Sequence, residues 1–167
     1  MELSEAMQIY FRGEKHTGFA MVAVGIALMA FAFWVWRTQS GAFAWWLLTP
    51  LAVVGLGAAI GGVVFALKTD TQVADLMARL ADDPGALVAS ESARMVKVNA
   101  NWPRLKLAWG VIAIGALVLL LAIKREWSAG LGLALILLVA VLFFMDVFAE
   151  RRAAPYTEAL AARAETE

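Results

Sequence analysis

The chain has 167 residues, of which 62% are hydrophobic and 17% are charged, whereas soluble domains average about 45–50% apolar and about 25% charged residues. A soluble domain of this length has too little interior to bury so much apolar surface, so the composition predicts an integral membrane protein. Lys and Arg together equal Asp and Glu at 14 each, which argues against nucleic acid as a partner, and the absence of cysteine excludes disulfides and thiolate metal sites.

The chain begins with a charged stretch, residues 1–17, that is expected on the cytoplasmic side. Leu3, Met7 and Tyr10 share one face of a helix over residues 2–11, which predicts a short amphipathic helix lying in the membrane interface. The apolar run that follows is longer than the roughly 7–15 residues of a signal-peptide core. We therefore expect this run to be retained as a membrane span.

Four apolar runs are long enough to cross the hydrocarbon layer, which needs about 20 helical residues. Lipid cannot satisfy backbone polar groups, so each run is predicted to be a helix. The joins within the first and the second pair of runs are short, which predicts two antiparallel hairpins. The expected fold is all-α, a single domain over residues 1–167, with transmembrane helices at about residues 18–36, 44–67, 105–123 and 129–149.

The second span is rich in glycine and has Pro50 near its start. Small residues allow helix backbones to approach closely in lipid, which predicts a helix-packing face. Packing against the Ala-rich first span is the favoured interpretation; self-association, a partner helix or a hinge at Pro50 is the alternative. On this basis leucine at Gly57 or Gly61 should destabilise the protein more than leucine at Gly132. The face comprises Gly55, Gly57, Gly61 and Gly62.

The remaining segments, residues 68–104 and 150–167, are predicted to form further short amphipathic helices in the cytoplasm. Val73, Leu76 and Leu80 recur at helical spacing, and the sequence Asp82–Gly85 breaks the pattern before a second helix that reaches about Asn101. Short stretches before and within the two hairpins resemble one another, which raises duplication as a hypothesis.

Charge and tryptophan distribution predict the orientation. Eleven of the 14 Lys and Arg residues fall on the side of the termini and the central segment, which the positive-inside bias places in the cytoplasm. Five tryptophans mark the opposite boundary, where amphipathic rings favour the headgroup layer. They are Trp34, Trp36, Trp45, Trp46 and Trp127. We expect a multi-pass protein of a bacterial cytoplasmic (plasma) membrane with both termini in the cytoplasm.

Few polar residues are candidates for a site. Asp146 is the only acidic residue inside an apolar run, and an ionisable group there is a functional hypothesis by default. A solvated or salt-bridged carboxylate near the boundary is the favoured alternative. If the bundle is compact, these residues meet in one polar layer at the cytoplasmic surface, which is either a polar, ion or lipid-headgroup site or a solvated anchoring ring. Its candidates are Asp146, Glu150, Arg151, His16 and Arg12.

The function predicted from these features is non-catalytic. A scaffold, assembly factor or accessory subunit would act through lateral helix contacts with the lipid bilayer, with another membrane protein or with copies of itself as a homo-oligomer. An oligomeric channel or transporter is the alternative, and a lipid-headgroup enzyme a weaker one. His16 is the only histidine, so no metal and no cofactor is expected: two-histidine haem ligation and a His-rich metal site are excluded within one chain.

Overall fold

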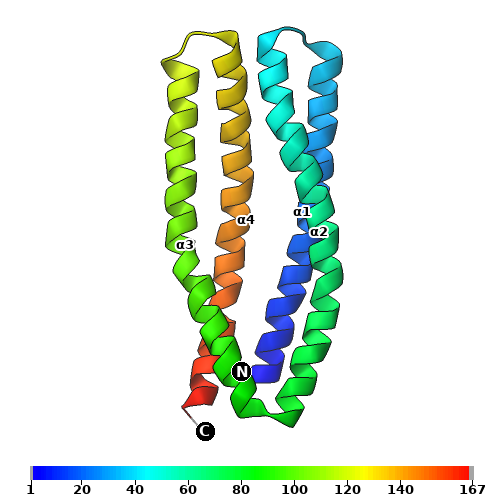
Figure 1. The fold of residues 1–167 in the computed structure, drawn as a ribbon, viewed down its shortest axis with the longest axis vertical. Coiled ribbons are helices and arrows are strands. Elements are labelled where there is room, and N and C mark those ends of the chain that lie inside the picture. Colours follow the sequence, from blue (N-terminus) through cyan, green and yellow to red (C-terminus); the bar gives the residue numbers. More distant parts are fainter. Residues whose placement is uncertain (1, 166–167) are drawn as a thin grey trace.

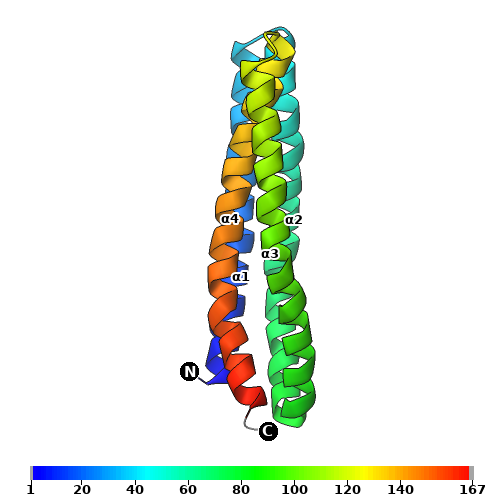
Figure 2. The ribbon, with the colours of Figure 1, turned by 90° about the vertical axis from the view of Figure 1, so that its left-hand side faces the viewer.

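The computed structural model describes residues 2–165, which fold into four long α-helices (Figure 1). Helices adjacent in the chain run in opposite directions, and both ends of the described chain lie at the same end of the bundle (Figure 2). Each helix is long and apolar enough to cross a membrane. The prediction of an all-α bundle with four candidate spans is therefore confirmed. The helices are α1 (Leu3–Thr38), α2 (Ala42–Asp82), α3 (Pro84–Leu121) and α4 (Glu126–Ala164).

The short amphipathic helices predicted for residues 1–17, 68–104 and 150–167 are not separate elements. Each of these segments is continuous with an apolar run, so the helices contain 36 to 41 residues. Only Asp83 interrupts the central segment. Its Oδ1 accepts a hydrogen bond from the backbone N–H of Ala86 at 2.9 Å, and Pro84 occupies the first position of α3, which is a typical helix start.

The helices continue because their end segments pack against one another rather than lying on the bilayer. This termini-side core joins all four helices, and its stripe on α1 is the face predicted to lie in the interface. Packing of an amphipathic face supplies most of the stability of a helix. This stabilisation exceeds the cost of continuing the helix through the polar residues that border each apolar run. The core comprises Met7, Tyr10, Phe11, Leu76, Leu87, Met95, Ala153, Tyr156 and Leu160, together with Ala6.

A second, loop-side core lies at the opposite end of the bundle, near residues 39–41. Its buried residues come from α1, α2 and α4, and α3 contributes none. The two most extensive helix contacts are α1 with α2 and α3 with α4. In the most apolar stretch of α3 only 6% of residues are buried, compared with 22% in α1 and α2. The loop-side core comprises Ala32, Val35, Ala44, Leu47, Leu51, Ala134 and Leu138.

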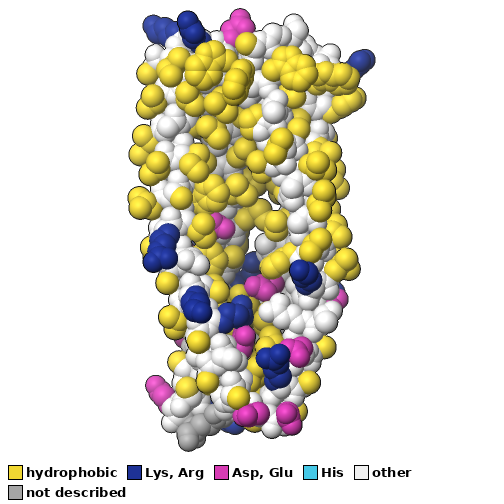
Figure 3. Space-filling model, in the orientation of Figure 1, with side chains coloured by type: hydrophobic (Ala, Val, Ile, Leu, Met, Phe, Trp, Pro, Cys, Tyr) yellow, Lys and Arg dark blue, Asp and Glu magenta, His cyan; other side chains and the backbone are white. Residues whose placement is uncertain are grey.

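The surface divides the bundle into an apolar part and a charged part. In Figure 3 hydrophobic side chains cover most of the upper part of the visible face, and Lys, Arg, Asp and Glu gather over its lower part, near the termini. A further group of basic side chains lies at the top edge. Because hydrocarbon favours apolar side chains and the interfaces favour polar ones, this pattern fits a bundle that crosses a bilayer.

Candidate functional site

Two pairs of glycines bring the backbones of α1 and α2 together. A Cβ atom on Gly62 would lie 2.5 Å from the carbonyl oxygen of Gly18, and one on Gly18 would lie 2.9 Å from the carbonyl oxygen of Gly62. Gly25 and Gly55 face each other in the same way one level further along the helices. The contacts leave no room for a side chain, so they are a packing interface within the chain.

The other two glycines of the predicted packing face point away from α1. No atom comes within 4 Å of a Cβ placed on Gly57, and at Gly61 only Cε of Met21 does, at 3.9 Å. A Cβ on Gly132, by contrast, would lie 2.8 Å from the carbonyl oxygen of Ala116. The expectation that leucine costs more at Gly57 or Gly61 than at Gly132 is therefore reversed. Gly55 and Gly62 are seven residues apart and therefore lie on the same face of α2, which meets α1. Gly57 and Gly61, the G-x-x-x-G pair, lie off that face.

Asp146 and Glu150, both on α4, contact α3. Oδ2 of Asp146 accepts a hydrogen bond from the indole N–H of Trp109 at 2.7 Å. Glu150 forms an ion pair with Lys106, with 2.6 Å between Oε2 and Nζ. The partner of Asp146 is therefore a tryptophan, whereas the sequence favoured solvent or an ion pair. Both carboxylates connect α3 to α4 near the termini-side end of the predicted spans.

The other three candidates do not join these carboxylates. Arg12 and His16 are exposed and border an open groove of about 470 Å³ that lies between α1 and α2. Lys15 lines the same groove and pairs with Asp70 at 2.6 Å. Arg151 is exposed on α4. The five predicted residues therefore lie at several surfaces of the bundle and do not form one site.

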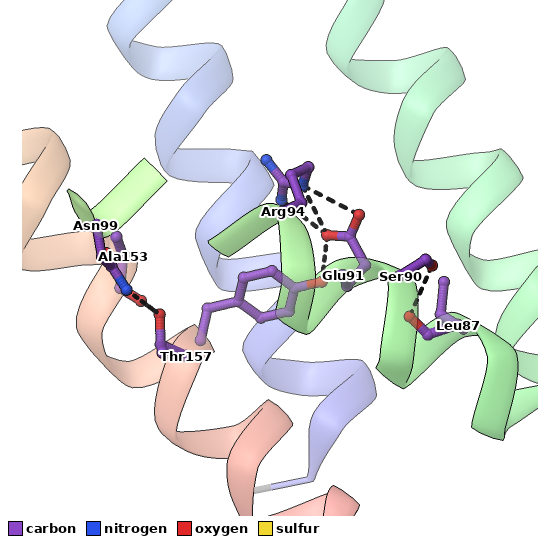
Figure 4. Close-up of polar contacts among 8 residues, drawn as sticks. Leu87, Ser90, Glu91, Arg94, Asn99, Ala153 and Thr157 are labelled. Carbon is purple, nitrogen blue, oxygen red and sulfur yellow. Dashed lines mark hydrogen bonds and ion pairs between the residues drawn. The ribbon is translucent and has the colours of Figure 1, made fainter. Parts of the chain in front are cut away.

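The most buried polar cluster is one that the sequence analysis did not identify. The side chain of Glu91 on α3 is 8% exposed and receives hydrogen bonds from Arg94, at 2.8 Å from Nη2 and 3.0 Å from Nε. The hydroxyl of Tyr156 on α4 donates a third bond to Glu91 at 2.9 Å (Figure 4). Glu91 lies four residues after Leu87 and four before Met95, so the helical spacing of this apolar stripe is the signal that indicates burial.

Aromatic rings surround this ion pair. The guanidinium carbon of Arg94 lies 5.8 Å from the ring centre of Tyr10 and 5.6 Å from that of Phe11, within cation–π range. Burial, together with the carboxylate of Glu14, raises the pKa of Tyr10 to about 12. Burial and Glu91 raise the pKa of Tyr156. Both phenols therefore stay neutral at physiological pH and act as structural hydrogen-bonding groups.

Glu14 and Arg152 extend the cluster toward the predicted membrane boundary. Burial raises the pKa of Glu14, although Tyr10, Arg94 and Arg152 act in the opposite direction. Nη2 of Arg152 donates to Oγ1 of Thr17 at 2.5 Å, while its buried Nε has no hydrogen-bond partner in the described part of the chain.

Gly13 on α1 lets the side chain of Arg152 pass. A Cβ on Gly13 would collide with Cδ of Arg152. No ion pair shorter than 4.0 Å involves Arg152 within residues 2–165. The sequence does not predict this arrangement, because Arg152 lies next to the buried residues of α4 but is not one of them.

An apolar groove of about 170 Å³ runs between α1, α2 and α4. Thr17 and Asp146 are its polar lining residues. In Figure 3 the visible face is hollowed between the two helix pairs, with apolar side chains above and charged side chains below. The apolar lining is formed by Met21, Val24, Leu28, Val54, Ala58, Leu138, Val141, Leu142, Met145 and Ala149.

Several hydroxyl groups near these clusters form hydrogen bonds within their own helices. The hydroxyls of Thr69, Ser90 and Thr157 each donate to a backbone carbonyl oxygen in their own helix. Across the described part of the chain, no group of three or more His, Asp or Glu side chains is placed to hold a metal ion. Comparisons with protein-family models, with curated proteins and with solved structures find no match to this chain.

Proposed function

We propose that the protein is a non-catalytic component of the cytoplasmic membrane that acts through lateral helix contacts, as a scaffold, an assembly factor or an accessory subunit. The observation that carries the proposal is the uncovered apolar face of α3. Leu107, Ile114 and Leu121 are 70%, 65% and 76% exposed. Gly110 and Leu117 lie on the same face, so the five residues recur at alternating intervals of three and four. Helices that pack against partner helices show this spacing. In the membrane this face is available to another membrane protein or to a second copy.

The loop-side core supports this proposal over a channel or transporter. Leu47, Leu51 and Leu138 pack together there, so apolar side chains fill the interior of this core. Ion and solute pathways need polar or charged groups along their length. The exposed face of α3 is also apolar, so an assembly of copies through α3 would not line a polar path.

Crosslinking tests the lateral contact directly, because the chain has no cysteine of its own. Cysteine at Ile114 on α3 should form crosslinked products in membranes after oxidation or addition of a bifunctional thiol reagent. The matched control is cysteine at Ile26 on α1, which has a similar exposed fraction of 59% against 65%. Products at Ile114 of twice the chain mass indicate self-association, and other masses indicate a partner protein. Equal yields at both positions, or none at Ile114, would contradict the proposal.

The proposed orientation has a separate test. Ser40 and Lys124 are exposed in the two loops at the end opposite the termini, and Lys97 is exposed near the termini. Cysteine at Ser40 or Lys124 should react with a membrane-impermeant thiol reagent added to intact cells, and cysteine at Lys97 should react only after lysis. The reverse pattern would place the termini outside.

A further inference from the structure

The groove between α1, α2 and α4 is closed at one end and polar at the other. At its loop-side end the groove is bounded by Leu138, which also belongs to the loop-side core. At the termini-side end Thr17 and Asp146 line it. The groove therefore has an apolar body within the predicted spans and a polar mouth at the predicted cytoplasmic headgroup level.

Arg152 supplies positive charge at this mouth. Its guanidinium reaches Thr17, which itself lines the groove, through the 2.5 Å bond from Nη2. Three other cations near these helix ends, Lys15, Arg94 and Lys106, each have a carboxylate within 2.8 Å. Arg152 lacks an ion-pair partner among residues 2–165, and its buried Nε has no hydrogen-bond acceptor. A buried donor of this kind is costly unless an acceptor satisfies it.

We propose that this groove binds one acyl chain of a membrane phospholipid, whose phosphate is held by Arg152. The hydroxyl of Thr17 donates to the carbonyl oxygen of Gly13 and accepts from Arg152, and so positions the guanidinium. The planar guanidinium matches phosphate oxygens and forms strong charge-assisted hydrogen bonds with them. Basic pockets between membrane helices on the cytoplasmic side are a recognised type of lipid-headgroup site. Asp146 also lines the groove, and its Oδ2 is occupied by the hydrogen bond from Trp109, so Arg152 is the group that receives the phosphate.

The dimensions of the groove favour a lipid over a partner helix. A helix with its side chains is about 10–12 Å across and cannot enter a space of about 170 Å³. Pockets for drug-sized ligands have about 300–1,000 Å³, so the groove suits a slender aliphatic chain. Free phosphate would satisfy Arg152 but leave the apolar body of the groove uncovered. The phospholipid alone matches both parts, and the bilayer supplies it.

Native mass spectrometry of the full-length chain in detergent tests the proposal, with phosphatidylethanolamine as the probe. One lipid should bind per chain, and Arg152→Gln should weaken binding by about tenfold or more, which corresponds to the loss of one charge-assisted contact. Arg151→Gln is the matched control, because Arg151 is the adjacent, exposed arginine and should leave binding unchanged. Diacylglycerol lacks the phosphate. Its affinity for the wild-type protein should be no higher than the affinity of phosphatidylethanolamine for the Arg152→Gln variant. Inorganic phosphate should not compete.

A groove-filling substitution tests the apolar part with Arg152 still in place. Ala58→Phe should abolish binding, and Val141→Leu is a milder variant that should reduce it, with helical content by circular dichroism confirming that each variant folds. Equal binding by the Arg152→Gln and Arg151→Gln variants would overturn the proposal. So would displacement of the lipid by inorganic phosphate, or unchanged binding when a folded variant fills the groove.

Discussion

Alanine at two adjacent glycines of α2 should have opposite effects on stability. Gly61 and Gly62 lie in the same helix, and alanine favours the helical conformation over glycine by about 0.8–1 kcal/mol at either position. At Gly61 the new methyl group meets only Cε of Met21 at 3.9 Å, which is an ordinary contact. At Gly62 it would lie 2.5 Å from the carbonyl oxygen of Gly18 and 2.9 Å from the backbone nitrogen of Val22.

Gly62→Ala therefore requires α1 and α2 to separate, because backbone atoms cannot rotate away as a side chain can. Overpacking of this kind typically costs about 1–3 kcal/mol. We expect Gly62→Ala to lower the free energy of unfolding by an amount in that range, and Gly61→Ala to leave it unchanged or raise it by up to about 1 kcal/mol. Reversible unfolding in mixed micelles of mild detergent and dodecyl sulfate, followed by circular dichroism, measures both.

The comparison is internally controlled, since both variants add one methyl group to the same turn of the same helix. Equal unfolding free energies would refute the assignment of Gly62 to the α1–α2 interface. A larger loss at Gly61 would show that the G-x-x-x-G face, and not the Gly18–Gly62 contact, packs against a neighbouring helix.

Three further predictions concern the polar side chains. Tyr156→Phe should lower the free energy of unfolding by about 1.5–3 kcal/mol, because it removes a hydrogen bond to a charged acceptor; no change would mean that the Glu91 contact is not formed. Burial raises the pKa of Glu14, so the folded state favours the protonated carboxyl group. This contribution to stability is complete below pH 4.5 and is lost as the pH rises through the raised pKa. Glu14→Gln should accordingly raise the melting temperature at neutral pH and leave it unaltered below pH 4.5, and a shift of equal size at both would refute this reasoning. Asp146→Asn keeps an oxygen that accepts from Trp109 and should cost only about 1 kcal/mol in the same micelle assay, whereas unfolding of the variant would show that the charge itself is needed.

The membrane character of the chain was predictable because it depends on composition and on long apolar runs. Each of the four runs predicted from hydropathy falls in one of the helices α1 to α4, although the third, 105–123, extends two residues past the end of α3 at Leu121. The continuity of the helices was not predictable, because it depends on packing between segments far apart in the sequence. Phe11 and Tyr156, for example, meet in the termini-side core although nearly the whole chain separates them.

The glycine contacts and the polar contacts between helices were harder to predict for the same reason. Periodicity places a residue on a helix face but does not say which helix that face meets, so Gly57 and Gly55 looked equivalent as packing residues. Ser128 lies in the short join between the third and fourth predicted spans, yet its hydroxyl donates to the carbonyl oxygens of Ile123 and Arg125 and the residue is fully buried. The inward position of Glu91 was readable from its spacing, whereas its partner Tyr156 comes from another helix.

The unbroken passage of each helix from the apolar part of the bundle into the charged part has a mechanical consequence. Helices of 36 to 41 residues are rods about 54–62 Å long, roughly twice the thickness of the hydrocarbon layer. Helices respond to a thicker or thinner bilayer by tilting, and a tilt of ~5° displaces the far end of such a rod by ~5 Å. Each of the four helices is continuous between the two parts, and only Pro103 of α3 removes a backbone hydrogen bond near the boundary. We therefore expect a change in bilayer thickness to move the termini-side end of the bundle relative to its membrane-spanning part.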